Sequence, residues 1–247
     1  DGGSTPGITR KRKKSQMTNP LKWGILSTGG IADQFTRDVL RLPDHRVVAV
    51  GSRELSRAND FADRFAIKNR HGNYQDLFND PEVDAIYVAT HHPLHARDTI
   101  AALEAGKPVL CEKPFAMSYA ETQAMVETAR QKNLLLMEAM WARYLPHMIR
   151  IREIIASGIL GEIISVRADH GQWFKLDPEF RLFKAELGGG ALFDLGVYPI
   201  SFAHMVLGSP EKITARSTKA FTGVDGQTTI ILEYKSGAHA LLNATNL

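Results

Sequence analysis

Apolar and polar residues follow a repeating order along residues 22–140: a short apolar run, a turn, and then a stretch with apolar residues at helical spacing. Short β-rich runs that alternate with helical stretches are typical of βαβ units with a parallel sheet. The pattern therefore predicts an α/β fold that begins with a doubly wound, Rossmann-type domain. The expected strands are 22–26, 46–52, 85–90, 108–113 and 134–140, and the expected helices are 31–42, 55–65, 93–106 and 118–133.

The pattern changes after residue 140, where helical and alternating segments are no longer interleaved one by one. Gly-containing turns separate the last three alternating segments, which predicts antiparallel strands. We expect a second, α+β domain with a large open, mostly antiparallel sheet, cut short within its last strand. Its expected elements are helices at 147–158 and 188–208 and strands at 162–173, 212–221, 227–237 and 239–247.

These changes of pattern suggest three parts: a tail at 1–20, a dinucleotide-binding domain at 21–143, and a substrate and dimerisation domain at 144–247. The 247 residues are 44% hydrophobic and 23% charged, an ordinary composition for a globular protein, with a net charge of +3. Residues 1–17 hold five basic residues and one acid, so the other 230 residues carry a net charge of −1. A nearly neutral body gives no reason to expect a nucleic-acid surface.

The tail is rich in Gly and Ser, then basic, and it has no apolar periodicity, which predicts disorder and leaves Met17 as a natural start. Its basic run, Arg10 to Lys14, keeps a nuclear-localisation or nucleic-acid role open as a minor alternative. No apolar segment follows that run as in a signal sequence, and no stretch reaches transmembrane length. A single cysteine, Cys111, fits a reducing compartment. We expect a cytoplasmic protein without a membrane partner.

The turn after the first predicted strand carries the first chemical signal. Compared with the phosphate-binding pattern G-x-G-x-x-G/A, Gly29 holds the second position and Ala32 the third, but a serine replaces the first glycine. Gly29 would let the backbone approach a pyrophosphate, and Ala32 would allow close packing of helix on strand. A strand before and a helix after favour dinucleotide binding over a simple turn. The residues of this loop are Ser27, Thr28, Gly29, Gly30, Ile31 and Ala32.

The end of the second strand indicates which dinucleotide is bound. An NAD-binding protein has an acidic residue here for the ribose hydroxyls, whereas this chain has Ser52 and Arg53. A hydroxyl and a guanidinium attract a 2′-phosphate, and Arg57 could add to the patch one helical turn later. We therefore expect NADP(H) in preference to NAD(H). The alternative is that either arginine is a solvated residue at a helix start.

A lysine follows the strand at 108–113. Lys113 and the preceding Glu112 lie at the carboxyl end of that strand, where open parallel sheets bind ligands. Such a lysine could bind a substrate hydroxyl, tune a neighbouring acid or stabilise a developing alkoxide. From spacing alone, a surface lysine before a turn proline is the simpler interpretation.

Several separated segments resemble one known family. "STGGIA", "EKP" and "GGGALFDLGVY" occur in the order found in the glucose–fructose oxidoreductase/inositol dehydrogenase (Gfo/Idh/MocA) family. "VLCEKPFAM", "LMEAMWARYLP" and "GGGALFDLGVYPISF" resemble the branch that contains dimeric dihydrodiol dehydrogenase and NADP-dependent D-xylose dehydrogenase. The resemblance extends over about residues 21–247. It implies an NADP-linked dehydrogenase of sugars, cyclic polyols or trans-dihydrodiols, acting as a homodimer through its C-terminal sheet.

The resemblance also implies roles for individual residues. The family lysine falls on Lys113, the family aspartate on Asp194, and the family histidine is replaced by Tyr198, as in that branch. A phenol is a competent acid/base when an ammonium stabilises its anion. Asp194 and Tyr198 are four residues apart on a predicted helix, so both should lie on one face. The alternative is a glycine-rich helix start with a buried tyrosine.

Other matched positions carry less specific signals. The resemblance puts Thr90, His92 and His95 near the nicotinamide ribose, together with Glu112 beside Lys113. It puts Trp141 and Arg143 with Tyr198 in the substrate pocket, although Trp141 could equally be a core residue. His170 is expected to join them, because the first strand of the second domain should face the cleft. "THHPLH" has three histidines, but no carboxylate or cysteine completes a ligand set, so no metal is expected.

Two functions from different classes stay open at this point. One is the dehydrogenase, with Lys113, Asp194 and Tyr198 in the catalytic roles. The other is a sensor or regulator that binds NADP(H) on the same fold without chemistry. A binding module has no need of an acid/base pair next to the nicotinamide, so the three residues favour the enzyme.

Overall fold

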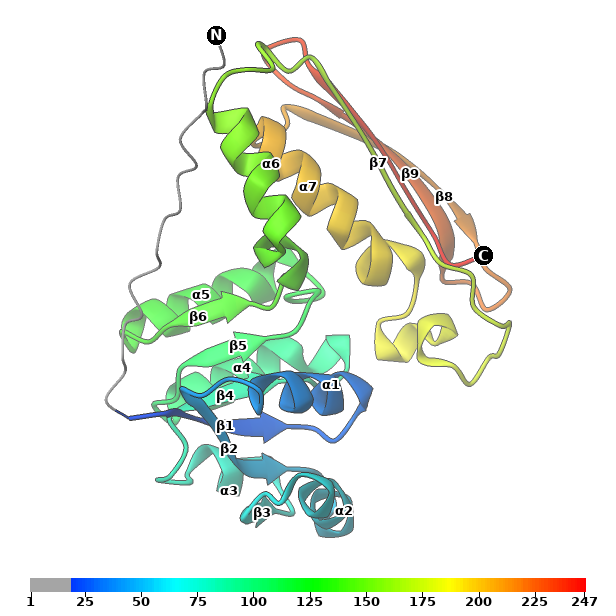
Figure 1. Cartoon of the computed structure of the whole chain (residues 1–247). Helices are drawn as coiled ribbons and strands as arrows, with labels where there is room; N and C mark the ends of the chain where they lie inside the picture. Colours follow the sequence, from blue (N-terminus) through cyan, green and yellow to red (C-terminus); the bar gives the residue numbers. More distant parts are fainter. Residues whose placement is uncertain (1–18) are drawn as a thin grey trace, which may run out of the picture.

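The computed structural model describes residues 19–247 and contains two β-sheets, linked through the short 3-10 turn η2 (Trp141–Tyr144) (Figure 1). Predictions for the tail, including its disorder, the basic run and a start at Met17, concern residues outside this described range. The α/β fold class is confirmed. The domain boundaries at 20/21 and 143/144 stay a prediction.

The first sheet has the strand order of a Rossmann fold. Its six strands are parallel and lie in the order β3-β2-β1-β4-β5-β6. The order reverses between β1 and β4, and a ligand crevice forms at the carboxyl ends of the strands at such a switch point. The strands are β1 (Leu21–Leu26), β2 (His45–Gly51), β3 (Asn69–His71), β4 (Ala85–Val88), β5 (Val109–Cys111) and β6 (Leu136–Glu138).

Helices cover both faces of this sheet, which explains why its strands are apolar runs and not alternating ones. Neighbouring residues of β1 point to opposite faces: Ile25 packs with one group of helices and Leu26 with the other. One face carries α1 (Gly30–Val39) and α2 (Leu55–Phe65), and the other carries α3 (Tyr74–Phe78), α4 (His95–Glu104) and α5 (Tyr119–Gln131). A 3-10 turn, η1 (His92–Leu94), precedes α4.

The second sheet is mixed, with the strand order β7-β10-β9-β8. The pairs β10–β9 and β9–β8 are antiparallel as predicted, whereas β7 runs parallel to β10. Because β7 and β10 are distant in the sequence, no hairpin constrains their direction. The strands are β7 (Ser165–Gly171), β8 (Lys212–Lys219), β9 (Asp225–Glu233) and β10 (His239–Thr245), and the helices are α6 (Pro146–Ala156) and α7 (Val197–Leu207).

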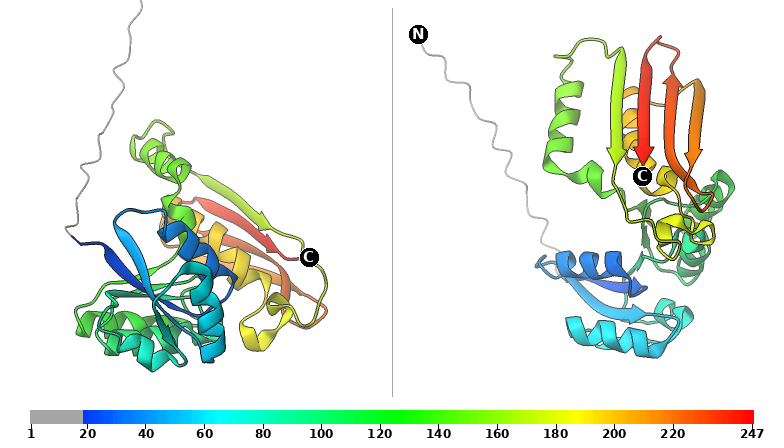
Figure 2. Two further views of the ribbon diagram at one scale, coloured as in Figure 1. Left: turned by 60° about the horizontal axis from the view of Figure 1, so that its bottom comes forward. Right: turned by 90° about the vertical axis from the view of Figure 1, so that its right-hand side faces the viewer.

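The two faces of this sheet differ. Helix α7 packs against β7 and β10, and its Ala203 joins a core with Ile230, Ala240 and Leu242. On the other face, no helix or strand from residues 19–247 covers the sheet (Figure 2). The segment Ala185–Leu207 is long and apolar enough to cross a membrane by length and composition, which corrects the expectation that no stretch is. Its last part, α7, packs against β7 and β10 of the second sheet.

Candidate active site

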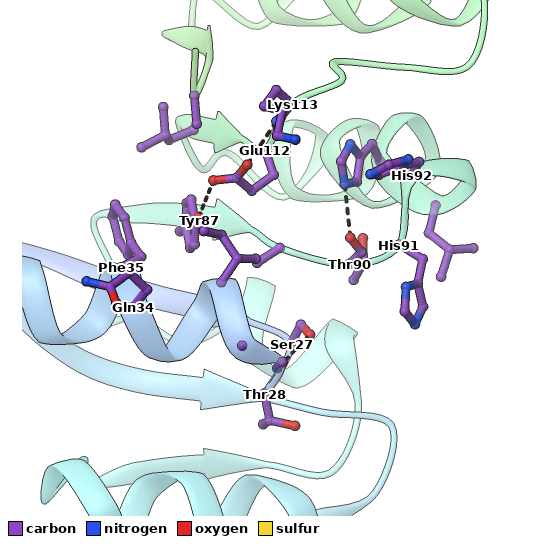
Figure 3. A pocket seen from close by; sticks show the side chains of 18 of the residues that line it. Ser27, Thr28, Gln34, Phe35, Tyr87, Thr90, His91, His92, Glu112 and Lys113 are labelled. Carbon is purple, nitrogen blue, oxygen red and sulfur yellow. Dashed lines mark hydrogen bonds between the residues drawn. The ribbon is translucent and has the colours of Figure 1, made fainter. Parts of the chain in front are cut away.

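A cleft of about 1050 Å³ opens at the carboxyl ends of β1, β2, β4 and β5 (Figure 3). Residues of the second half of the chain, Arg181, Asp194 and Tyr198, bound its other side. The cleft thus lies at the switch point of the first sheet, where a ligand was predicted. The predicted cofactor residues in its lining are Ser27, Thr28, Gly29, Gly30, Ile31, Ser52, Arg53, Arg57, Thr90, His92, His95, Glu112 and Lys113.

The loop after β1 has a glycine-like backbone at its first position. Ser27 adopts a φ of 104°, in the left-handed region that favours glycine. Its amide donates to the carbonyl of Gly51 (3.0 Å), and its Oγ accepts from the amide of Gly29 (3.3 Å). The substitution of serine for the first glycine, which weakens the sequence match, is therefore compatible with the turn that the pattern requires.

The next residues of the loop leave room for a ligand. A Cβ added at Gly30 would meet no atom within 4 Å, and one at Gly29 would meet only Ser27 Oγ, at 3.7 Å. Both glycines begin α1, whose amide groups and dipole favour an anion. Ala32 does not line the cleft; it is fully buried beside Ile25, which is the packing part of its predicted role.

The end of β2 presents a hydroxyl and two guanidinium groups to the cleft. Ser52 is nearly buried, and its amide donates to the carbonyl of His71 (3.0 Å). Arg57 is paired with Glu54, with Nε 3.2 Å from Oε2. Arg53 is exposed and forms no ion pair within residues 19–247. Arg53 is therefore the arginine whose charge is free for a ligand.

Two of the residues after β4, His92 and His95, are buried. Burial lowers the pKa of His95, whose ring nitrogens lie 2.8 Å from the carbonyl oxygen of Pro114 and 3.0 Å from that of Thr90. Burial likewise lowers the pKa of His92 to about 4, and His92 Nδ1 lies 2.9 Å from the carbonyl oxygen of Gly188. Thr90 Oγ1 is buried without a hydrogen-bond partner in the described chain, as expected of a group that awaits a ligand.

The structure brings the three predicted catalytic residues together at the inner end of the cleft. Lys113 Nζ donates to the backbone carbonyl of Asp194 (2.8 Å) and to its Oδ1 (3.1 Å). The same Nζ lies 5.0 Å from the ring centre of Tyr198. Trp141 Nε1 donates to the Tyr198 hydroxyl (2.9 Å), so an indole from η2 also reaches this group.

Asp194 does not lie on a regular α-helix as the sequence predicts, whereas Tyr198 lies in the first turn of α7. Residues Leu192–Gly196 form a π-helical turn, η5, directly before α7. Such turns are rare and are often found at functional sites. Through this turn the Asp194 carboxylate and the Tyr198 ring both still face Lys113, which their spacing on one face predicts.

A second cation, Arg181, contacts the same carboxylate. Its Nη2 lies 3.0 Å from Asp194 Oδ1, the oxygen that also accepts from Lys113. Burial alone would raise the pKa of Asp194, but the charges of Lys113 and Arg181 outweigh it, and the pKa lies below its ordinary value. Asp194 is therefore a carboxylate over the whole neutral range.

The cleft is also lined by a buried hydrogen-bonded pair, of which the sequence predicted Glu112 but not Tyr87. The Tyr87 hydroxyl donates to Glu112 Oε1, and Oε2 accepts from the Lys113 amide (3.1 Å). Burial raises the pKa of Glu112, although both of these hydrogen bonds stabilise its ionised form. Phe35 stacks on Tyr87 with ring centres 3.7 Å apart.

Some of the cleft residues that the sequence analysis did not predict could have been found from helical spacing, and others could not. Ile31, Gln34, Phe35 and Asp38 line the cleft at the i, i+3, i+4, i+7 spacing of one helix face, so the position of Ile31 could have identified the others. Arg181 is thirteen residues from Asp194 and belongs to no motif. The remaining lining residues that were not predicted are Tyr74, Tyr87, Ala89, His91, Leu94, Leu110, Met137, Ala139, Tyr144 and Arg181.

The predicted substrate residues are only partly in the lining. Trp141 and Tyr198 line the cleft, whereas Arg143 and His170 do not. The His170 ring packs against Tyr198 with centres 4.9 Å apart, and Arg143 Nη1 is 3.5 Å from Ser201 Oγ. Within residues 19–247, no group of three or more His, Cys, Asp or Glu residues is arranged to hold a metal ion.

Comparison with protein families covers both parts of the chain. The model of the oxidoreductase family with an NAD-binding Rossmann fold matches residues 21–140, and that of the Gfo/Idh/MocA C-terminal domain matches residues 148–247. The chain belongs to the Gfo/Idh/MocA oxidoreductase family. The family resemblance of the sequence motifs is thereby confirmed.

Curated relatives are similar over most of the chain. The trans-1,2-dihydrobenzene-1,2-diol dehydrogenases of Mus musculus and Bos taurus are 42% and 43% identical to it over 223 residues, which is 89% of this chain. The chain spans 66% of the length of each of these two relatives, slightly less than two thirds.

Solved structures of the family superpose closely. A 3-ketoreductase from Actinomadura kijaniata, KijD10, in complex with NADP and TDP-benzene, has a TM-score of 0.84 at 32% identity, covering 92% of this chain and 70% of that one. An aldose–aldose oxidoreductase from Caulobacter crescentus has a TM-score of 0.85 at 27% identity, covering 92% of this chain and 71% of that one.

Proposed function

We propose that this chain is an NADP(H)-dependent oxidoreductase that acts on a CH–OH group, or its carbonyl, of a trans-dihydrodiol, sugar or cyclic polyol. One observation carries the proposal: Lys113, Asp194 and Tyr198 converge at the inner end of a dinucleotide cleft. A protein that only senses the cofactor has no use for this cluster. The names of the relatives, a dihydrodiol dehydrogenase and an aldose oxidoreductase, support the class of substrate.

The residues of the cleft fit a dinucleotide. Gly29 and Gly30 leave open space where an added Cβ would intrude, at a helix N-terminus suited to a diphosphate. The unpartnered Thr90 Oγ1 lies in the same cleft and can bind a ribose hydroxyl. Ser52 and the unpaired Arg53 suit a 2′-phosphate and offer no acceptor carboxylate for an NAD ribose. This supports NADP(H) as the cofactor.

When bound, the nicotinamide supplies the acceptor or donor of the hydride. Tyr198 is the acid/base: its hydroxyl oxygen accepts a hydrogen bond from Trp141 and so leaves its own proton directed to the substrate. Lys113 places a positive charge beside the Tyr198 ring, where it stabilises negative charge on the substrate oxygen or the phenol oxygen. Asp194 orients the Lys113 ammonium through two contacts.

Two aromatic side chains line the cleft on the same side as Tyr198, which favours a ring as substrate. Trp141 and Tyr144 come from η2, line the cleft, and are both more than half exposed. Aromatic faces stack on the apolar faces of dihydrodiols and sugars alike. The similar proteins make the dihydrodiol the first candidate and the aldose the second.

The test is a turnover assay with NADP or NAD and a panel of dihydrodiols, aldoses and inositols, followed by the absorbance of the reduced nicotinamide. We expect turnover of at least one diol or aldose with NADP. Binding of NADPH measured by protein fluorescence, with no turnover across the panel, would contradict the enzyme and favour the sensor. Equal or better turnover with NAD would contradict the assignment of Arg53 to a 2′-phosphate.

Two further parts of the proposal concern assembly and location. The uncovered face of the second sheet carries Ile231 and Leu241, which lie directly opposite each other on β9 and β10 and are both more than a third exposed. This supports a homodimer through that face, which Ile231→Glu should dissociate in light scattering. The single, buried Cys111 supports a cytoplasmic protein.

A further inference from the structure

Arg181 holds an unusual place in the cleft. It lies on η3 (Arg181–Phe183), a different element from those that carry Lys113 and Asp194, and its Nη2 is 3.0 Å from Asp194 Oδ1. Its side chain is 41% exposed and lines the cleft, whereas the side chains of Asp194 and Lys113 are 6% and 13% exposed. One buried carboxylate oxygen is therefore shared by two cations.

The turn that carries Arg181 is held in place by its own side chains and by its backbone. The two residues after Arg181, Leu182 and Phe183, are buried and anchor the turn in the core. The backbone of the turn also lies against the triple glycine: a Cβ on Gly189 would come within 2.7 Å of the carbonyl oxygen of Leu182 and within 2.9 Å of that of Arg181. The amide of Gly190 donates to the carbonyl of Leu182 (2.8 Å). The glycine motif thus allows the Arg181 turn to pack beside η5.

Resting on the proposed function, we propose that Arg181 is a positioning residue of the reaction, which holds Asp194 in the orientation that aims Lys113 at Tyr198. Two donors on one oxygen fix the carboxylate in place more firmly than one, and a guanidinium does so through a rigid planar fork. Arg181 does not contact Tyr198 and transfers no proton. Its effect passes entirely through Asp194.

The groups around Asp194 determine what happens without Arg181. Lys113 lies after β5, Arg181 on η3 and His92 on η1, with His92 Nε2 3.9 Å from Oδ1; the Glu112 carboxylate adds a more distant negative charge. Without Arg181, Lys113 would be the main charge that lowers the pKa of Asp194, against burial and the Glu112 charge, which both raise it. The carboxylate would ionise less readily and turn more freely, and the ammonium would lose its fixed direction.

The experiment compares Arg181→Met and Arg181→Lys with wild type. We expect Arg181→Met to lower kcat by about 10- to 100-fold, because small misplacements of catalytic groups have effects of this size. The KM of the substrate and the Kd of NADPH should change less than about threefold, because the variant loses stabilisation of the transition state and not binding of the substrate or the cofactor. Arg181→Lys, which keeps the charge, should recover part of the loss. The matched control is Lys184→Met, in the same turn, whose Nζ is paired with the exposed Glu179.

A second measurement does not depend on activity. The ¹³C signal of the Asp194 carboxyl carbon, assigned with Asp194→Asn, reports its protonation as the pH is lowered. We expect the pKa of Asp194 to rise in Arg181→Met and to stay unchanged in Lys184→Met. Unchanged titration together with unchanged kcat would overturn the proposal.

The two measurements separate the possible failures. A loss of NADPH affinity without a change in kcat or in the Asp194 titration would make Arg181 a cofactor ligand and overturn the positioning role. If wild type shows no turnover with any substrate, the proposed function fails, and the carbon signal still decides whether Arg181 controls Asp194. If Arg181→Met unfolds, Arg181→Lys carries the test, with a smaller loss of kcat expected.

Discussion

The two ends of the cleft are built in different ways. The end that suits a dinucleotide consists mainly of backbone and of consecutive residues, Ser27 to Ile31, at the start of one helix. The end that suits the chemistry consists of side chains from separate segments: Lys113 after β5, Arg181 on η3, and Asp194 on η5. The first end depends on local conformation, and the second depends on the packing of one half of the chain against the other.

This difference predicts different responses to substitution. In the backbone end a changed side chain should alter cofactor affinity and leave the rest of the molecule as it is. In the side-chain end each group is held by charge and hydrogen bonds from another segment, so a change should alter the rate of the reaction. The predictions below test that division, from the largest expected effect to the smallest.

Lys113→Met should have the largest effect. We expect kcat to fall by about 10³-fold, the scale of removing one electrostatic contact from a transition state. Arg181 still neutralises the buried Asp194 carboxylate in this variant, so the protein should remain folded. Steady-state kinetics and NADPH titration measure both quantities, with Lys132→Met, an exposed partner of Glu104, as the control. Equal losses of kcat and NADPH affinity would contradict the division between the two ends.

Arg53→Ser should have the next largest effect, and only on one cofactor. A hydrogen-bonded ion pair with a 2′-phosphate contributes about 1.5–3 kcal/mol, so NADP affinity should fall by about 10- to 100-fold while NAD affinity stays the same. Arg57→Ser should lower NADP affinity less, because Arg57 is already paired with Glu54. Calorimetric titrations with both dinucleotides measure this. A larger effect at Arg57, or equal losses for NADP and NAD, would rule out the assignment.

His92 connects the two ends through the carbonyl of Gly188, and its burial makes that connection sensitive to pH. Its pKa is lowered from 6.5 to about 4 on folding, so the unfolded chain binds more protons than the folded chain between these pH values. The protein therefore becomes less stable as the pH is lowered. We expect the free energy of unfolding to drop by about 2 kcal/mol more in wild type than in His92→Gln between pH 7 and pH 5. Urea titrations at the two pH values give this difference. Parallel losses in the two proteins would show that His92 is protonated as easily folded as unfolded.

The same contrast explains what could be predicted from the sequence. The phosphate loop, the doubly wound parallel sheet and the positions of Lys113, Asp194 and Tyr198 follow from local periodicity and from motifs. β3 has only three residues, Asn69 to His71, none of them apolar, so no periodic pattern marks it. Arg181 and the buried Tyr87–Glu112 pair depend on which segments pack together, and a single sequence does not contain that information in any short window. Ser27 shows the opposite situation: the motif is weakened because a serine replaces its first glycine, yet the backbone there still has the positive φ that the turn requires.

The smallest expected effect tests the backbone end directly. Gly29→Ala adds a Cβ that meets only Ser27 Oγ, at 3.7 Å, and the residue has an ordinary φ of −76°. The free energy of unfolding should therefore change by less than about 0.5 kcal/mol, whereas NADPH affinity should fall by about three- to tenfold, the size of roughly 1 kcal/mol, because the methyl group stands where a diphosphate approaches. Gly51→Ala is the matched opposite: its Cβ would lie 2.9 Å from Leu77 Cδ2 in the core. That variant should lose about 1–3 kcal/mol of stability and keep its NADPH affinity.

Urea unfolding and NADPH titration of the two glycine variants measure both effects. A stability loss at Gly29 as large as that at Gly51 would mean that the open space at the helix start is needed for folding and not for the cofactor.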